Sequence, residues 1–179
     1  MNKLFLALVL FATPLAARAD VGLRLGMEAN VATHNDSGTS WLGDNWPLAG
    51  NVMLSYWTPG SFLSFDLEIA EQFYGSAPTG LSSRVGTVVR PGIRITPPLL
   101  PIYFRGALPI NVETATGERE LLDARIGVGF NIPLVLFKIY LEADADFPLT
   151  SKTNASGGSN ISAFNQQAFL IGGGLDFRF

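Results

Sequence analysis

Apolar and polar residues alternate along most of this chain, which is the period of a β-strand whose two faces meet different surroundings. In the stretch 83–96, Val, Thr, Pro and Ile occupy the odd positions after Ser83, and arginine and glycine occupy most of the even ones. Seven further stretches alternate in the same way. The pattern therefore predicts eight strands, over 21–31, 47–57, 62–73, 83–96, 102–112, 122–132, 137–147 and 167–179.

The segments between these strands are alternately long and short. The long ones are polar, at 32–46, 75–82, 114–120 and 148–165, and the short ones are rich in proline or turn residues, at 58–61, 97–101 and 133–136. An even number of strands joined in this way returns both ends of the chain to one side. Because proline lacks a backbone N–H, we expect a bulge or a local loss of pairing at Pro91, and a second irregularity at Pro109.

Charged residues within the predicted strands lie opposite the apolar face, except Glu71 near a strand end. An Arg or Lys facing lipid at mid-membrane would cost roughly 2–4 kcal/mol, whereas a soluble barrel would carry its charges outside. We therefore expect lipid against the apolar face and charge in the interior. The predicted interior charge network is Arg24, Glu28, Asp66, Glu68, Arg84, Arg90, Arg94, Arg105, Asp123, Arg125, Glu142 and Asp144. The same face carries Glu113, Lys138, Asp146, Asp176 and Arg178.

Acids and bases on this inner face are nearly balanced, and frequent inward glycines leave room for long side chains. We expect the arginines of 83–96, 102–112 and 122–132 to meet carboxylates of 62–73 and 137–147. An eight-stranded barrel has a lumen that side chains can fill. The sequence thus predicts a plugged interior without a wide pore.

Aromatic residues gather near the ends of the predicted strands, a distribution typical of the two interfaces of a membrane. We expect these residues to form two girdles: Trp41, Trp46, Trp57, Phe62, Phe73, Tyr74, Tyr103, Phe137, Phe147 and Phe164.

The first 19 residues have a different pattern, with Lys3 before the apolar run 4–12 and Ala17-Arg18-Ala19 before Asp20. This order is typical of a secretory signal peptide, and the run is too short for a membrane helix. We expect residues 1–19 to be that signal and residues 20–179 to form one domain. The chain has no cysteine and a net charge of −3 without a basic cluster, which argues against disulfides and nucleic acid.

The chain ends in a predicted strand, 167–179, with Phe169, Ile171, Phe177 and Phe179 on one face. This ending resembles the final strand of bacterial outer-membrane β-barrels, where aromatic residues alternate up to a C-terminal Phe. The resemblance implies that Phe177 and Phe179 belong to the signal read by the barrel-assembly machinery.

Over 20–179 the chain is similar in architecture to small barrels of the OmpA/OmpX type. That similarity implies an all-β fold, an eight-stranded antiparallel up-and-down transmembrane β-barrel, integral to the outer membrane of a Gram-negative bacterium. Both termini and the short connections would face the periplasm. The implied function is structural or interactive, through four extracellular loops and a protein partner that the sequence does not identify, with outer-membrane lipid around the wall.

Three alternatives stay open: an outer-leaflet lipid-modifying enzyme, a narrow conduit or carrier of apolar ligands, and a secreted soluble barrel. His34 is the one histidine, and with Ser76 or Ser82 it is the candidate for lipid-modifying chemistry. Glu142, Asp144 and Asp146 could offer oxygen ligands to a metal. The His34 pattern does not match that of the known lipid-modifying barrels, and carboxylates opposite inward arginines are more often ion-paired than metal-bound, so we predict no catalytic, metal or cofactor-binding residue and no cofactor.

Overall fold

The computed structural model describes residues 20–35, 38–41, 47–57, 61–74, 84–114, 122–149 and 167–179. Its secondary structure is entirely β in these ranges. The strands are β1 (Asp20–Asn35), β2 (Gly38–Trp41), β3 (Pro47–Trp57), β4 (Leu63–Tyr74), β5 (Arg84–Ile95), β6 (Ile102–Ala107), β7 (Ile110–Thr114), β8 (Asp123–Pro133), β9 (Lys138–Pro148) and β10 (Gln167–Arg178). The proposed signal peptide lies outside the described residues.

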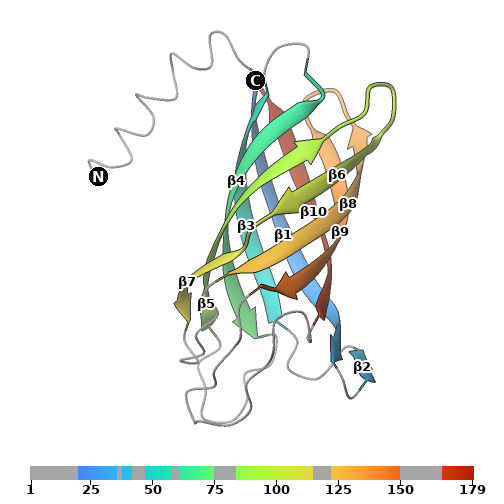
Figure 1. Cartoon of the computed structure of the whole chain (residues 1–179). Coiled ribbons are helices and arrows are strands. Elements are labelled where there is room, and N and C mark those ends of the chain that lie inside the picture. Colours follow the sequence, from blue (N-terminus) through green and yellow to red (C-terminus); the bar gives the residue numbers. More distant parts are fainter. Residues whose placement is uncertain are drawn as a thin grey trace, which may run out of the picture.

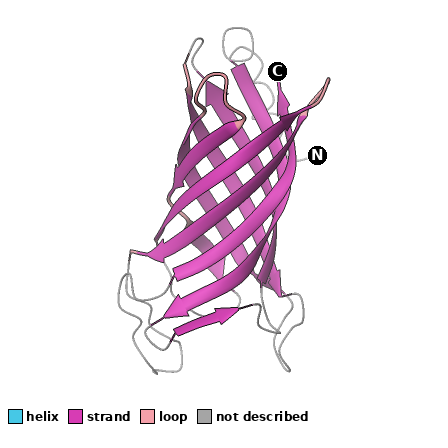
Figure 2. Cartoon of the chain, turned by 90° about the vertical axis from the view of Figure 1, so that its right-hand side faces the viewer, coloured by secondary structure: helices cyan, strands magenta, loops and turns pink. Residues whose placement is uncertain are grey.

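The strands form one closed antiparallel barrel (Figures 1 and 2). Neighbours in sequence pair around the wall, and β10 closes the circle by pairing with both β9 and β1. Eight wall positions result, because β6 and β7 are two parts of one wall strand and β2 folds back on the end of β1. The predicted eight-stranded fold is therefore confirmed. Phe179 and Val21 exchange backbone hydrogen bonds, so the two ends of the barrel segment lie together.

Pro91 explains the division of β6 from β7. Its C=O accepts a hydrogen bond from the N–H of Leu108, at 2.9 Å. A residue in an antiparallel strand directs its C=O and its N–H to the same neighbouring strand. The N–H that Pro91 lacks is therefore missing on the side of β6 and β7. Pairing with β5 stops at Ala107 and resumes at Ile110, while the β4 side keeps its register through Leu67 and Pro91. The strand predicted over 102–112 is interrupted here, at the irregularity that was predicted for Pro109.

The loop was predicted to begin at residue 32, which is too early. β1 continues to Asn35, and β2 pairs with its last four residues. A register shift between Asn30 and Ala32 reverses the alternation of faces beyond this point. Polar residues were interpreted as a loop, but here they form a hairpin that projects beyond the barrel wall (Figure 1).

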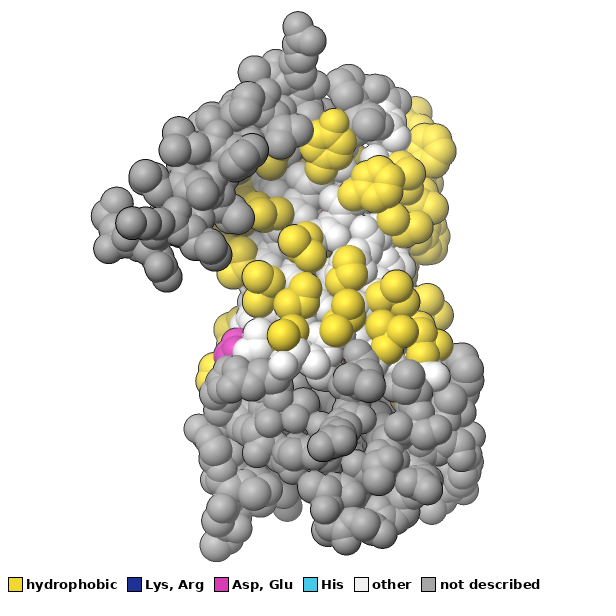
Figure 3. All heavy atoms as spheres, turned by 60° about the vertical axis from the view of Figure 1, so that its left-hand side comes forward, with side chains coloured by type: hydrophobic (Ala, Val, Ile, Leu, Met, Phe, Trp, Pro, Cys, Tyr) yellow, Lys and Arg dark blue, Asp and Glu magenta, His cyan; other side chains and the backbone are white. Residues whose placement is uncertain are grey.

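The outer face of the wall is apolar and the inner face is polar. On β4, Leu67 and Ile69 are 49% and 53% exposed, whereas Glu68 and Ala70 between and beside them are 1% and 0% exposed. Figure 3 shows apolar side chains across the described wall on one face, with an acidic side chain at its edge. Such an outer surface is stable against lipid and would aggregate in water.

Candidate functional site

The charged interior is the candidate site. Ten predicted network residues are at most 6% exposed and form ion pairs: Arg24, Glu28, Asp66, Glu68, Arg90, Arg94, Arg105, Arg125, Glu142 and Asp144. Asp123 is half-buried at the start of β8, opposite Pro148. The Arg84 and Glu113 side chains lie outside the described ones. The network also includes Asp146 and Asp176, which the alternation had placed on the same face.

Arg125 on β8 joins strands on opposite sides of the lumen. Its guanidinium makes two bonds to Asp146 on β9, at 2.6 and 2.7 Å, and Nη1 donates to Glu28 on β1 at 2.7 Å. Glu28 also accepts a hydrogen bond from Arg90 on β5. These bonds connect four wall strands, β1, β5, β8 and β9. Charges buried in an interior of low dielectric constant are stable only when they are paired and hydrogen-bonded in this way.

Glu68 and Glu142 bridge the next layer of the lumen. Arg90 donates to Glu68 at 2.6 Å, and Arg105 donates to both Glu68 and Glu142, the latter at 3.1 Å. Glu142 further accepts from Arg24 Nη1 at 3.3 Å and from the hydroxyl of Tyr103 at 2.5 Å. Each carboxylate is therefore shared between strands.

Asp176 and Asp66 complete the network at the end that carries Val21 and Phe179. Arg24 Nε donates to Asp176 at 2.9 Å. Arg94 pairs with Asp66 at 3.3 Å and Asp176 at 3.5 Å. The same guanidinium donates to Ser55 at 2.7 Å and Ser64 at 3.3 Å, two hydroxyls that the sequence analysis did not single out.

We define the central ionic network as five arginines (Arg24, Arg90, Arg94, Arg105, Arg125) and seven carboxylates (Glu28, Asp66, Glu68, Glu142, Asp144, Asp146, Asp176). The carboxylates outnumber the arginines. Asp144 is the least well paired, because its ion pair with Arg125 is 3.9 Å long and its Oδ1 has no hydrogen-bond partner. Asp144 is therefore the member of the network that contributes the least bonding.

Guanidinium groups and aromatic rings alternate beside this network. Arg178 and Arg94 lie 4.8 Å from the ring of Trp57, and Arg94 also lies 5.6 Å from Tyr103. Arg24 lies 4.5 Å from Tyr103 and 4.4 Å from Tyr140. We call these six residues the arginine–aromatic column: Arg178, Trp57, Arg94, Tyr103, Arg24 and Tyr140. Cation–π attraction is strongest where water is excluded, as it is at Arg94 and Arg24, each 1% exposed.

Two residues expected in the aromatic girdles, Trp57 and Tyr103, belong instead to this column inside the barrel. Trp57 is 6% exposed and Tyr103 is 0% exposed, so both fill the lumen. The alternation contained this signal, since the odd-numbered Tyr103 lies between the outward Ile102 and Phe104. Trp41, Phe62 and Phe73 do lie on exposed surface, whereas Trp46 and Phe164 lie outside the described residues.

Gly129 makes room for the column. A Cβ on Gly129 would overlap the ring of Tyr103, which is packed between Arg24 and Arg94. We expect Gly129→Ala to lower the free energy of unfolding by about 1–3 kcal/mol, the usual cost of overpacking. Urea unfolding in phospholipid vesicles measures it. Gly106→Ala is the matched control, because a Cβ there meets nothing within 4 Å. Equal losses in the two variants would contradict the close packing.

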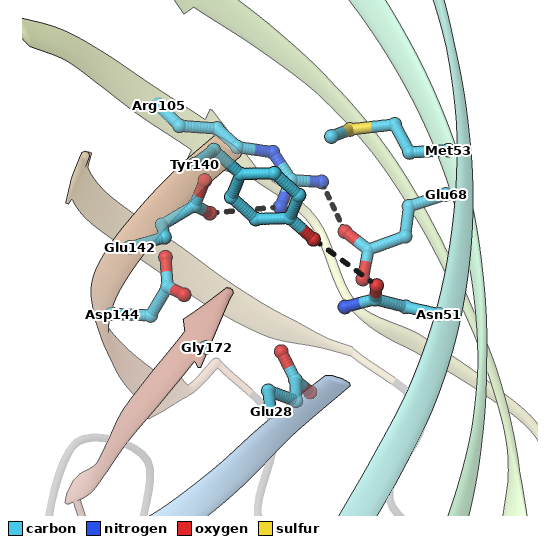
Figure 4. Close-up of a pocket in the computed structure, with 9 residues that line it drawn as sticks. All are labelled: Glu28, Asn51, Met53, Glu68, Arg105, Tyr140, Glu142, Asp144 and Gly172. Carbon is cyan, nitrogen blue, oxygen red and sulfur yellow. Dashed lines mark hydrogen bonds and ion pairs between the residues drawn. The ribbon is translucent and has the colours of Figure 1, made fainter. Parts of the chain in front are cut away.

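A small cavity lies inside the network, lined by both acids and bases (Figure 4). Its volume is about 10 Å³, the size at which one water molecule begins to fit. Its lining residues are Glu28, Asn51, Met53, Glu68, Arg105, Tyr140, Glu142, Asp144 and Gly172. A drug-sized ligand needs roughly 300–1,000 Å³, so this cavity can hold water but not an acyl chain.

The other candidate chemistry is not assembled in the described residues. His34 lies at the exposed end of β1 and its Nδ1 is 2.8 Å from the Thr39 hydroxyl. Ser76 and Ser82 lie outside the described ranges. No group of three or more His, Asp or Glu residues within those ranges is arranged to hold a metal ion. No helix in the same ranges is long and apolar enough to cross a membrane.

The closed barrel, its apolar outer wall and its charged lumen are the fold of small eight-stranded outer-membrane β-barrels. The chain is similar to the crystal structure of Neisserial surface protein A (NspA), with a TM-score of 0.56 and 10% identity over 89% of this chain and 97% of that one. This likeness bears on the fold. No protein-family model and no curated protein matches the sequence.

Two further solved structures show weaker similarity. The outer-membrane protein AlkL, solved in DMPC bilayers, has a TM-score of 0.43 and 10% identity, covering 90% of each chain. OmpT of Vibrio cholerae has a TM-score of 0.27 and 13% identity, covering 89% of this chain and 52% of that one.

Proposed function

We propose that this protein is a structural or interaction protein of the outer membrane, a closed and non-conducting barrel that displays its four long connections outside the cell. The supporting observation is the way Arg24 spans the lumen. Its side chain, 1% exposed on β1, bonds to Tyr103 on β6, Asn131 on β8, Glu142 on β9 and Asp176 on β10. A lumen crossed by such fixed groups leaves no continuous aqueous path of ion width.

Conductance across planar bilayers tests the proposal. Refolded protein, shown to be folded by its shifted migration on an unheated gel, should give no stable single-channel steps above those of protein-free membranes. A matched channel-forming porin, reconstituted in parallel, establishes that insertion is detected. Large and stable steps from the wild-type barrel would reject a non-conducting function and favour the conduit.

The enzymatic alternative is tested at His34. Its side chain contacts Thr39 and takes the outward face after the register shift in β1. Nucleophilic or general-base chemistry needs a base held by a further group, and no carboxylate is bonded to His34 within the described residues. We expect cells producing the wild-type protein and the His34→Ala variant to have the same lipid A profile. A lipid A species present only with the wild type would contradict the proposed function.

A further inference from the structure

Two connections at the end of the barrel that carries Phe179 have large apolar side chains at their tips. Residues 96–101 join β5 to β6, and residues 134–137 join β8 to β9. Leu99 and Val135 are 102% and 99% exposed, and Leu136 is 83% exposed. Neither connection contains a charged residue. We call Leu99, Leu100, Leu134, Val135 and Leu136 the apolar rim.

Leu99 occupies a backbone conformation that disfavours it. Its φ is 70°, the one positive value at a non-glycine residue in the described part of the chain. The residue follows Pro98 in a turn, where a positive φ is adopted most easily by glycine or asparagine. A leucine here adds strain and, being fully exposed, gains no packing within the protein. A contact outside the chain is the remaining source of stabilisation.

The backbone of the first connection, 96–101, is also poor in donors. Three of the six residues in 96–101 are prolines, which have no N–H. The N–H of Thr96 donates to the C=O of Phe62 at 2.8 Å, and the N–H of Leu134 donates to the C=O of Phe137 at 2.8 Å. Unsatisfied backbone donors are what excludes turns from the hydrocarbon core, and the prolines lower the number of donors in 96–101.

The apolar rim continues the lipid-facing wall. On β8 the outward residues Ile126, Val128, Phe130 and Ile132 are 39–59% exposed, and Leu134 extends the same column at 48%. The C=O of Pro101 accepts a hydrogen bond from the N–H of Asn131 at 2.6 Å, so the first connection is fastened beside β8. The first connection therefore lies beside β8, whose outward face continues into the second connection.

We propose that the apolar rim inserts into the periplasmic leaflet, where phospholipid chains and the inner edge of the headgroups cover it. The inference rests on the chain being an integral outer-membrane barrel and adds a second lipid contact, made by the turns. Leucine and valine side chains of this exposure gain by leaving water, and lipid is already present at the adjoining wall. The rim would hold the β5–β9 side of the barrel at a fixed depth.

Spin labelling measures the environment of the rim directly. The chain has no cysteine, so Leu99→Cys and Val135→Cys each provide one attachment site for a nitroxide. Ile69→Cys on the lipid-facing wall and Thr39→Cys on the exposed hairpin are the references for lipid and water. The proteins are refolded into vesicles of phosphatidylethanolamine and phosphatidylglycerol. Collisions with oxygen, which partitions into lipid, and with a water-soluble nickel chelate are then compared.

The labels at Leu99 and Val135 should resemble the Ile69 label, with nickel-chelate accessibility several-fold below that at Thr39. Accessibility equal to that at Thr39, while the Ile69 label stays in lipid, would reject rim insertion and leave the integral barrel intact. An Ile69 label in water would instead reject the barrel's membrane orientation. Leu100→Cys replaces Leu99→Cys should the latter fail to fold.

A second copy of the chain is the competing occupant, and dilution distinguishes it. In nanodiscs that hold one barrel each, protection from the nickel chelate should persist at Leu99 and Val135. Protection that disappears in these nanodiscs, or spin–spin broadening that is lost on dilution with unlabelled barrel, would assign the rim to a protein contact and overturn the proposal.

Discussion

Arg125→Met should destabilise the barrel by about 3–5 kcal/mol, the usual cost of breaking a buried ion pair by removing one partner. Arg125 is 1% exposed and binds Glu28 and Asp146 closely, with Asp144 at 3.9 Å. Methionine fills similar volume but leaves these carboxylates with less positive charge, in a network where acids already outnumber arginines. Urea unfolding of vesicle-embedded protein, followed by tryptophan fluorescence, gives the free energy of unfolding.

Two carboxylate variants give the matched comparison. Asp144→Asn keeps the size and polarity of a buried side chain that bonds poorly, so we expect unchanged or increased stability. Asp146→Asn removes the two-bond ion pair with Arg125. Because the Asp146 side chain is 18% exposed, we expect this variant to lower the free energy of unfolding by about 1 kcal/mol. If Asp144→Asn lowered the free energy of unfolding as much as Arg125→Met, the weak bonding of Asp144 would be contradicted.

The Arg125→Met/Asp146→Asn double variant tests whether the network acts as a unit. Residues in one ion-pair network are not additive. Once Arg125 is absent, neutralising Asp146 removes an unpaired carboxylate, so the double variant should be more stable than Arg125→Met alone. Simple addition of the two single losses would contradict the coupling inferred from their contact distances.

The barrel and the faces of its strands were predictable because both follow from local alternation. In a thin wall between lipid and lumen, each successive side chain meets one environment or the other, so the period of two holds along whole strands. Pro91 was predictable for a related reason, since the missing N–H acts locally. The irregularity predicted at Pro109 lies in the gap between β6 and β7, whereas the loss of pairing between Pro91 and that gap needed the structure, because it depends on which neighbour the missing donor faces.

The pairing inside the lumen was less predictable. Carboxylates of the third predicted strand and arginines of the fourth and fifth do meet, as Glu68 shows with Arg90 and Arg105. The pairing of Arg125 with Glu28 on β1 depends on barrel closure and strand tilt, which alternation does not contain. Trp57 and Tyr103 show the other limit. Their parity indicated the interior, but position near a strand end was given more weight.

The arginine–aromatic column is the part of the plug whose removal should change function most. We expect the Tyr103→Ala/Tyr140→Ala variant to give discrete single-channel steps that the wild type lacks. Both rings contact Arg24, at 4.5 and 4.4 Å, and their loss leaves that side chain unsupported beside an enlarged void. Acids and bases line the opened lumen in nearly equal number, so we expect little preference between K⁺ and Cl⁻, which the reversal potential in a KCl gradient measures.

Tyr103→Phe/Tyr140→Phe is the matched control, because it keeps the rings and removes the hydroxyls that bond to Glu142 and Asn51. This variant should stay closed if ring packing seals the lumen. Truncating a large buried aromatic ring costs about 3–5 kcal/mol of stability. Recordings therefore use only protein that migrates as folded, and Tyr103→Ala alone is the milder variant.

Channels in the phenylalanine variant would assign the seal to hydrogen bonds. An absence of channels in the folded alanine variants would assign the seal to the ion pairs. Ring packing is shown to seal the lumen if the folded alanine variants conduct and the phenylalanine variant does not.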